Sequence, residues 1–257
     1  MAYSSNGVNW TTVSNSTFGS YDITAIAYAN GKFVAVGDSG KMAYSSDGVS
    51  WTAVSNSRFS SDDINAIAYG GNKFVAVGDW GTMAYSSDGI NWTAVSNSTF
   101  GYTDINAIAY GGGKFVAVGD YAKAAYSSDG VSWTAVSNSA FGNYDINTIA
   151  YGDGKFIAGS DYGKMAYSSN GANWTAIADG TFGSADIAAI AYGNGKFVAG
   201  SDSGKTAYSS NGVNWTAVTH SILGIAVFLS DINAIAYGNG KFVAGSEDGK
   251  MWYSTGL

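Results

Sequence analysis

Residues 63–103 read DINAIAYGGNKFVAVGDWGTMAYSSDGINWTAVSNSTFGYT, and this 41-residue unit recurs along the whole chain. Its tryptophan returns at a constant spacing, at Trp10, Trp51, Trp92, Trp133, Trp174 and Trp215. The Asp-Ile pair that starts at Asp63 and the Lys-Phe pair that starts at Lys73 also occur six times each. A fixed period of this length is the signature of a repeat architecture. The sequence therefore predicts six copies of one structural unit.

Each unit contains four short runs rich in Ile, Val, Ala, Tyr, Phe and Trp, separated by clusters of Gly, Asn, Asp and Ser. This pattern is typical of four strands joined by hairpin turns, which we name A, B, C and D in chain order. Units of four antiparallel strands that repeat every 40–45 residues are typical of β-propellers, whose closed ring protects the sheet edges. We therefore expect an all-β, six-bladed β-propeller with four antiparallel strands per blade, formed by residues 1–257 as a single domain.

The two ends of the sequence suggest how the ring closes. Residues 1–14 contain strands C and D of a unit, and residues 231–257 contain strands A, B and C. We expect the N-terminal strand near Trp10 to be the outer strand that completes the last blade and closes the ring. Strand C is present seven times, and we expect the C-terminal copy to fill the last blade, because its direct hairpin to strand B gives it the higher effective concentration.

Composition narrows the classes of partner. The chain has 12 Lys and Arg against 19 Asp and Glu, a net charge of −7, and phosphate binding needs clustered basic residues. We therefore expect no nucleic-acid partner. No long apolar run and no basic-then-apolar start is present, so we expect no membrane insertion and no signal peptide. We also expect a monomer.

The turn between strands C and D resembles a known motif. It reads SSDG followed by two residues and Trp at 45–51, 86–92 and 127–133. This resembles the Asp-box of sialidases and many other bacterial propellers, one residue shorter. The whole unit is similar to bacterial repeats of the form AYGNGKFVAVGD…YSSDGxxW from secreted and cell-surface proteins, which implies a secreted or cell-surface location.

The resemblance implies structural roles for two residues of this turn. The aspartate holds its own turn by accepting bonds from nearby backbone N–H groups, and the tryptophan packs between blades. The aspartates concerned are Asp47, Asp88 and Asp129. Residue chemistry agrees, because Asn6, Asn170 and Asn211 occupy the same position and asparagine makes the same turn. Calcium binding is the alternative role for these carboxylates.

Catalysis is not expected. A sialidase needs an arginine triad, and Arg58 is the only arginine of this chain. His220 is the only histidine and Cys is absent, which argues against a zinc site and a Ser-His-Asp triad. The turn carboxylates recur once per blade, whereas a catalytic site brings chemically different groups together once. We therefore expect no enzyme activity, no cofactor and no metal.

A binding function is expected on the face formed by the B–C turns and the D–A connections. The residue that follows the B–C aspartate changes from blade to blade, through Ser39, Trp80, Tyr121, Tyr162, Ser203 and Asp248. Exposed aromatic rings on three neighbouring blades can stack on sugar rings while adjacent polar groups bond the hydroxyls. The candidate ligand residues are Trp80, Tyr121 and Tyr162 with Asp79, Asp120 and Asp161, aided by Lys123 and Lys164. The alternative is that these are surface positions without a role.

Two features of the D–A connections stand out. Their phenylalanines are expected to plug the space between blades, at Phe18, Phe59, Phe100, Phe141 and Phe182. The last connection, residues 219–230, is four residues longer than the others and apolar, and it either packs over the central channel or forms a contact patch.

Two functional hypotheses follow. The first is a non-catalytic binding or scaffold propeller, lectin-like with repeated shallow sites, whose ligand is a glycan or a protein. The second is a recently amplified or engineered symmetric propeller with no specific ligand, because the early blades share VAVGD and the later ones share AGSD or AGSE.

Overall fold

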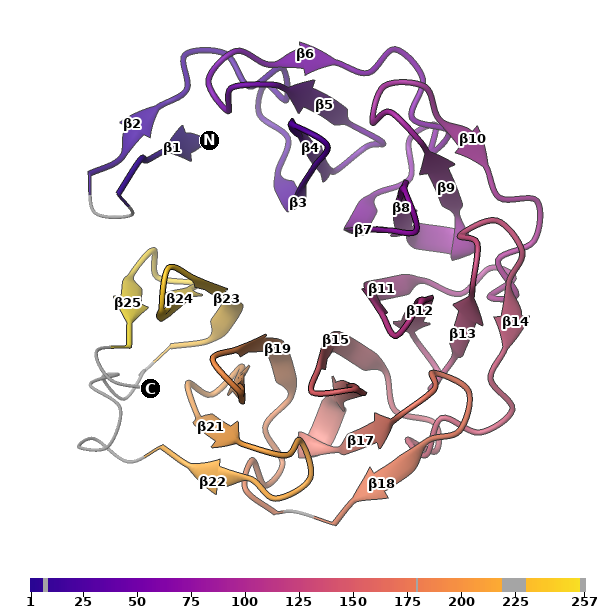
Figure 1. Ribbon diagram of the computed structural model, residues 1–257, viewed down its shortest axis with the longest axis vertical. Coiled ribbons are helices and arrows are strands. Elements are labelled where there is room, and N and C mark those ends of the chain that lie inside the picture. Colours follow the sequence, from indigo (N-terminus) through magenta and orange to yellow (C-terminus); the bar gives the residue numbers. More distant parts are fainter. Residues whose placement is uncertain (7–8, 179, 219–229, 255–257) are drawn as a thin grey trace.

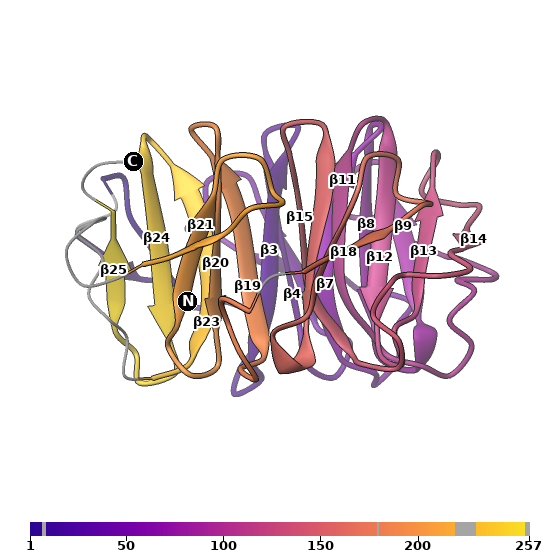
Figure 2. The same cartoon turned by 90° about the horizontal axis from the view of Figure 1, so that it is seen from below.

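The computed structural model describes residues 1–6, 9–178, 180–218 and 230–254. The sheets are arranged radially around one axis (Figure 1), and the strands run along that axis (Figure 2). The chain is an all-β, six-bladed β-propeller, as the repeat predicts. Most blades have four antiparallel strands, paired in chain order from the innermost to the outermost strand.

Blades one to five are complete. Blade one contains β3 (Ile23–Ala29), β4 (Lys32–Gly37), β5 (Met42–Ser45) and β6 (Thr52–Ala53). Blade two contains β7 (Ile64–Gly70), β8 (Lys73–Gly78), β9 (Met83–Ser86) and β10 (Thr93–Ala94), with the short 3-10 turn η1 (Asp79–Gly81). Blade three contains β11 (Ile105–Gly111), β12 (Lys114–Gly119), β13 (Ala124–Ser127) and β14 (Thr134–Ala135).

Blade four contains β15 (Ile146–Gly152), β16 (Lys155–Ser160), β17 (Met165–Ser168) and β18 (Thr175–Ile177), with the turn η2 (Asp161–Gly163). Blade five contains β19 (Ile187–Gly193), β20 (Lys196–Ser201), β21 (Thr206–Ser209) and β22 (Thr216–Ala217). Blade six has three strands among the described residues, β23 (Ile232–Gly238), β24 (Lys241–Ser246) and β25 (Met251–Tyr253). A separate hairpin consists of β1 (Ala2–Tyr3) and β2 (Thr11–Thr12).

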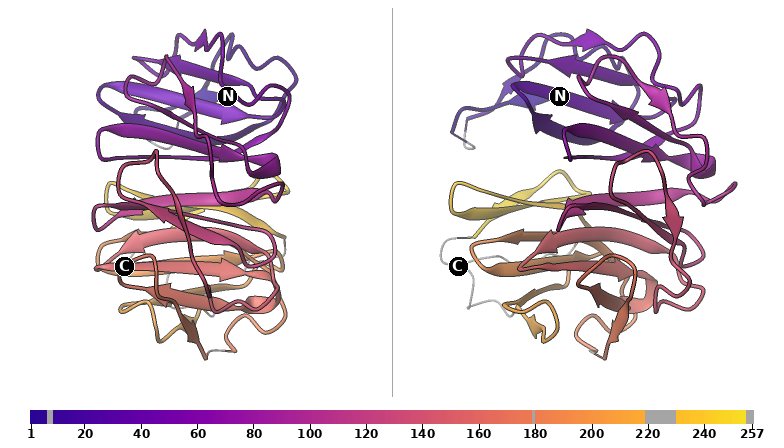
Figure 3. Two further views of the ribbon diagram at one scale, coloured as in Figure 1. Left: turned by 90° about the vertical axis from the view of Figure 1, so that its right-hand side faces the viewer. Right: turned by 45° about the vertical axis from the view of Figure 1, so that its right-hand side comes forward.

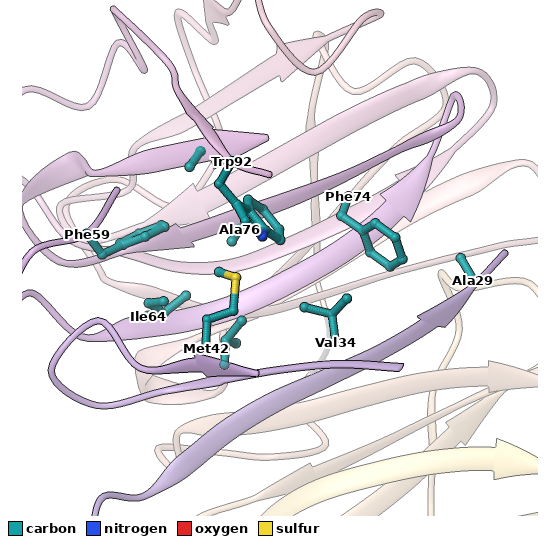
Figure 4. Close-up of a cluster of buried hydrophobic side chains, with 10 residues drawn as sticks. Ala29, Val34, Met42, Phe59, Ile64, Phe74, Ala76 and Trp92 are labelled. Carbon is teal, nitrogen blue, oxygen red and sulfur yellow. The ribbon is translucent and has the colours of Figure 1, made fainter. Parts of the chain in front are cut away.

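The hydrophobic core lies between neighbouring blades. Figure 4 shows the cluster in which Val34 and Met42 of blade one face Ile64, Phe74 and other side chains of blade two. The D–A phenylalanines are at most 3% exposed. The prediction that they plug the space between blades is confirmed for Phe59, Phe100, Phe141 and Phe182. Phe18 instead packs between blade one and the β1–β2 hairpin. Alanines on the facing strands keep the sheets close.

In blades three to six, a tyrosine fits over the end of the preceding blade's inner strand. That strand ends in glycine in blades two to five, and a Cβ atom added there would lie 2.0 Å or less from the next blade's tyrosine Cγ. The pairs are Gly70 with Tyr110, Gly111 with Tyr151, Gly152 with Tyr192 and Gly193 with Tyr237. No real Cβ atom makes so close a contact, so only glycine allows the tyrosine ring to lie this near the strand. Blade one has Ala29 at this position, and there the Tyr69 hydroxyl accepts a hydrogen bond from Asn30.

The ring does not close as the sequence suggested. Strand β2 pairs with β1 and not with β25, so the outer strand expected from residues 1–14 is missing from blade six. Figure 3 shows the N-terminal hairpin apart from the C-terminal sheet. Trp10 is 52% exposed instead of filling a slot between blades. The C-terminal copy of strand C does pair with strand B of blade six, as expected.

The chain connectivity explains this difference. Strands β1 and β2 are joined by a short turn in which the Asn6 side chain accepts a bond from the Asn9 N–H at 2.9 Å. Forming this hairpin orders only a few residues, whereas pairing β2 with β25 closes a loop through nearly the entire chain. Met1 and Val13 then anchor the hairpin on Phe18 and neighbouring side chains of blade one.

The tyrosine-glycine contact predicts a position-dependent effect of one substitution. Gly111→Val places a branched side chain where the Tyr151 ring lies, and we expect a loss of about 1–3 kcal/mol in the free energy of unfolding. Gly238→Val, at the same position of blade six, has no atom within 4 Å of its new Cβ and serves as the matched control. Urea unfolding of both variants measures the difference, and an equal loss in both would contradict this account.

Candidate ligand-binding face

The B–C turns of blades one to four carry their tip residue in the left-handed backbone conformation, with φ between 52° and 56° at Ser39, Trp80, Tyr121 and Tyr162. In each case the tip N–H donates to the aspartate that precedes the inner strand of the next blade. The Trp80 N–H reaches Asp104 Oδ1 at 2.7 Å, and the Tyr162 N–H reaches Asp186 Oδ1 at 2.8 Å. Each tip is therefore fixed by the neighbouring blade.

Three of these tips carry large exposed rings. Trp80 is 61% exposed, Tyr121 70% and Tyr162 57%, so these side chains contribute little to the core. The left-handed conformation does not favour them either, because glycine and asparagine adopt it at lower cost. Ser39 occupies the same conformation in blade one. Neither backbone nor packing therefore requires an aromatic residue at the tip.

The aspartates beside the rings are partly engaged in the scaffold. Asp79 Oδ1 accepts a bond from Asn65 Nδ2 at 3.0 Å, and the same amide reaches the Ile105 carbonyl of blade three. Asp120 and Asp161 accept equivalent bonds from Asn106 and Asn147. Each aspartate thus uses one carboxylate oxygen within the protein.

The same face is strongly acidic. Burial raises the pKa of Asp79, although its bond from Asn65 acts in the opposite direction, and the nearby carboxylates Asp104, Asp63 and Asp62 raise it further. The pKa of Asp120 is raised in the same way, with burial as the largest cause and Asp145 as the carboxylate whose charge raises it most. The Lys123 Nζ donates to the Phe100 carbonyl and the Thr103 hydroxyl, so its ammonium group is held against the scaffold, and the carboxylates outnumber it. The face therefore disfavours anionic ligands.

Three tyrosines on this face were missed by the sequence analysis. Tyr102 is 88% exposed, Tyr21 45% and Tyr144 40%, all in D–A connections. The Tyr21 ring already contacts Lys41, whose Nζ lies 5.0 Å from its centroid. The Tyr144 and Tyr162 rings lie 5.2 Å apart between centroids. The B–C tips were found because their residue varies from blade to blade. The residues at the two D–A positions vary in the same way, so the same comparison of blades could have found these tyrosines. We call Trp80, Tyr102, Tyr121, Tyr144 and Tyr162 the aromatic rim.

Shallow hollows accompany the tips. A hollow of about 270 Å³ lies beside the tip of blade two, lined by Gly81, Thr82 and residues 94–98. The equivalent hollow of blade one, about 300 Å³, is lined by Ser39, Gly40 and residues 53–57. The two hollows occupy equivalent places beside the tips of two blades, and no ring of the aromatic rim lines either of them.

The C–D turns lie at the opposite ends of the strands. Asp47 Oδ1 accepts the N–H groups of Val49 and Ser50, both at 2.8 Å, and the Ser45 hydroxyl at 2.9 Å. The backbone N–H of Ser50, followed by that of Val49, lowers the pKa of Asp47 to about 2. The Ser132 N–H is the largest cause of the equally low pKa of Asp129, about 2. At Asp88, N–H donors outweigh the opposing effect of burial and also lower the pKa.

Asparagine forms the same turn without a charge. Asn170 Oδ1 accepts the N–H groups of Ala172 and Asn173, both at 2.9 Å. Most tryptophans that follow these turns pack between blades, with Trp92 at 2% and Trp215 at 8% exposure and Trp133 and Trp174 partly buried. Trp51, 9% exposed, packs between blade one and the N-terminal hairpin. This geometry supports a structural role for Asp47, Asp88 and Asp129.

No cluster of three or more His, Cys, Asp or Glu side chains suited to a metal ion occurs within residues 1–6, 9–178, 180–218 and 230–254. In that same part of the chain, no helix is long and apolar enough to cross a membrane. His220 and most of the apolar connection 219–230 lie outside the described residues.

Comparison with known proteins identifies relatives in fold. No family model and no curated protein sequence matches the chain. Among solved structures, it is similar to YCF48 bound to a D1 peptide, with a TM-score of 0.69, 16% identity, and coverage of 91% of this chain and 78% of that one.

The computationally designed protein Ika8 is similar at a TM-score of 0.67 and 15% identity, with coverage of 91% of this chain and 70% of Ika8. The extracellular domain of the putative hybrid two-component system BT4673 from B. thetaiotaomicron matches at a TM-score of 0.69 and 15% identity. That match covers 90% of this chain and 32% of the other. At these identities the likeness shows the propeller fold.

The low pKa values of the C–D turns predict a difference in acid stability. A carboxyl whose folded pKa is depressed stabilises the folded state above its unfolded pKa, and this contribution is lost as the pH falls through the folded pKa. The triple variant Asp47→Asn, Asp88→Asn and Asp129→Asn should therefore lose less stability than the parent between about pH 4 and about pH 2.

Urea unfolding midpoints at neutral pH and across this acid range measure the effect. The reverse variant, Asn170→Asp with Asn211→Asp, adds two titrating turns and should make the acid loss steeper. Parallel pH profiles for all three proteins would show that these turn carboxylates do not govern acid stability.

Proposed function

We propose that this chain is a non-catalytic binding propeller whose ligand contacts the aromatic rim. The observation that carries the proposal is the exposure of Trp80, Tyr121 and Tyr162 at rigid tips, where neither backbone conformation nor core packing requires an aromatic ring. A large exposed aromatic group held in a fixed position lowers the entropy cost of binding. Such rings are frequent anchors of ligands.

The chemistry of the rim favours a neutral glycan. Aromatic faces stack on the apolar faces of sugar rings, and the second carboxylate oxygen of Asp79, Asp120 or Asp161 offers an acceptor for hydroxyl groups. The surrounding carboxylates repel sialylated or phosphorylated sugars. Repetition over neighbouring blades allows several weak contacts to act together on one branched or polymeric ligand.

A binding function is favoured over hydrolysis. Arg58, the only arginine, donates from Nε to the Trp92 carbonyl at 2.8 Å, a bond that ties the D–A connection to blade two. This engagement supports a structural role for Arg58 and leaves the chain without the guanidinium cluster that a sialidase requires. We therefore assign no catalytic residue.

Two other outcomes correspond to specific relatives in fold. YCF48 has been solved with a bound D1 peptide, which makes an extended peptide the second candidate ligand for the rim. Ika8 is a computationally designed propeller, and its likeness to this chain corresponds to the alternative of an amplified or engineered ring with no ligand.

Screening on glycan and peptide arrays tests the proposal. We expect binding to neutral glycans, a roughly five- to tenfold weaker affinity for Trp80→Ser, and loss of binding when Tyr121→Ser and Tyr162→Ser are added. Serine is the matched replacement because Ser39 already occupies the same left-handed tip in blade one. Melting temperatures should therefore remain unchanged.

The opposite substitution provides a second control. Ser39→Trp adds a ring to blade one and should strengthen binding to polymeric ligands. Binding of peptides alone would assign the rim to a protein partner, and silence on both arrays would support the ring without a ligand. Binding that survives the triple serine variant would place the site elsewhere.

A further inference from the structure

The inner part of the face of blade one that points away from blade two is uncovered. Ile26 and Tyr28 of β3 are 54% and 61% exposed. The equivalent isoleucines in blades three, four and five are 7–8% exposed, because the preceding blade covers them. Ile23 is only half-buried, whereas each of its five equivalents is 0% exposed. Ala35 and Ala43, farther out on the same face, are buried beneath the N-terminal hairpin. Blade one therefore leaves open only the inner part of the surface that the other blades pack against a neighbour.

The opposite face of blade six is uncovered as well. Ala234, Ala236 and Gly238 of β23 are exposed, although the equivalent alanines of β19 are 6% and 8% exposed. A Cβ atom on Gly238 has no neighbour within 4 Å, whereas one on Gly193 would lie 2.0 Å from Tyr237. Gly245 is equally open, whereas a Cβ on Gly200 would lie 2.7 Å from Ile232 of the next blade.

These two exposed faces are of the two types that pack against each other at every interface between neighbouring blades. Every interface inside the chain joins an Ile-Ala-Tyr face to an Ala-rich face, and in four of the five the tyrosine ring lies over a glycine. Blade one offers Tyr28 and Ile23, and blade six offers Gly238 and Gly245 to receive them. Inside the chain, the N–H of each tip residue of blades one to four donates to the aspartate that precedes the next blade's inner strand. Asp248 is the tip residue of blade six, and Asp22 precedes the inner strand of blade one, so Asp22 can accept the Asp248 N–H in the same way.

The N-terminal hairpin separates the two faces within one molecule. It lies between blade six and blade one (Figure 1), and Met1 and Val13 hold it on blade one. A groove of about 410 Å³ remains between the hairpin and β3, lined by Met1, Ala2, Ile23 and Ile26. The hairpin supplies only the outer strands C and D of a blade, so this groove lies where the inner strands would stand.

We propose that the blade-six face of a second copy of this chain docks on the blade-one face, and that the chain associates head to tail. Strands β23 and β24 of the second copy enter the groove beside β3, and β25 takes the place of β1 next to β2. The interface is heterologous, so two copies exchange both ends to form a closed dimer, or further copies extend the array. The proposal differs from the monomer that we expect from the sequence.

Cysteine cross-linking tests the contact, because the chain contains no cysteine of its own. By analogy with Gly193 and Tyr237, positions 238 and 28 lie in direct contact across the junction, so cysteines there can be joined by a disulfide after a small shift of the two backbones. We expect a mixture of the Tyr28→Cys chain and the Gly238→Cys chain to form a disulfide-linked pair at twice the chain mass on oxidation. Gly238→Cys mixed with Tyr102→Cys is the control and should stay unlinked.

The double variant carries both cysteines in one chain. It shows whether the blade-six face that meets blade one belongs to a second copy or to the same chain. Linked species at twice the chain mass or above support a second copy. A disulfide within a single chain, with no linked pair in the mixture, would show that the ring closes on itself and would overturn the proposal, as would the absence of any cross-link.

Light scattering provides an independent readout. The unmodified chain should increase in mean mass with concentration, and Gly238→Val should abolish this increase while its melting temperature in the dilute state stays unchanged. Gly180→Val is the control, because Gly180 also has no neighbour within 4 Å of an added Cβ and lies away from both faces. A constant mass equal to that of one chain for the unmodified protein would overturn the proposal.

Discussion

The contact between one blade and the next is the constraint on which this molecule depends. Each blade is a narrow sheet whose two faces carry apolar groups, and no blade can bury both faces without two neighbours. The tyrosine over the glycine sets how closely the inner strands approach. The aspartate that accepts the tip N–H fixes the outer end of the B–C turn. Packing and hydrogen bonding therefore specify the same arrangement at each interface.

The candidate site is a product of these contacts. Asp104 holds the Trp80 backbone, so the tip side chain is free to vary while its position stays fixed. Serine, tryptophan and tyrosine all occupy this turn with nearly the same φ. The scaffold thus separates the residues that specify the fold from those available to a ligand. Variation among otherwise similar blades is the signal that marks the second group.

The repeat was sufficient to predict the blades, their strands and the buried phenylalanines, because period and turn chemistry are local properties of the sequence. The N-terminal strand was not predictable in the same way, since β2 has two equivalent partners in β1 and β25 and the choice depends on loop closure. The bonds of Asp79 with Asn65 were also hidden, because a strand bulge between Ile64 and Ala66 aligns them. Tyr102 and Tyr144 were overlooked, although their positions also vary from blade to blade and the comparison between blades could have identified them.

An interface that repeats without change specifies the neighbours of a blade but not the number of blades. The number is set where the array meets another surface, and here the two terminal faces differ from the interior ones only in lacking a partner. The N-terminal hairpin occupies the outer part of that position and leaves the inner part open. Ring closure and self-association then compete for the same tyrosine and glycine. Because both outcomes bury the same side chains, the balance between them depends on chain concentration and on the stability of one short hairpin.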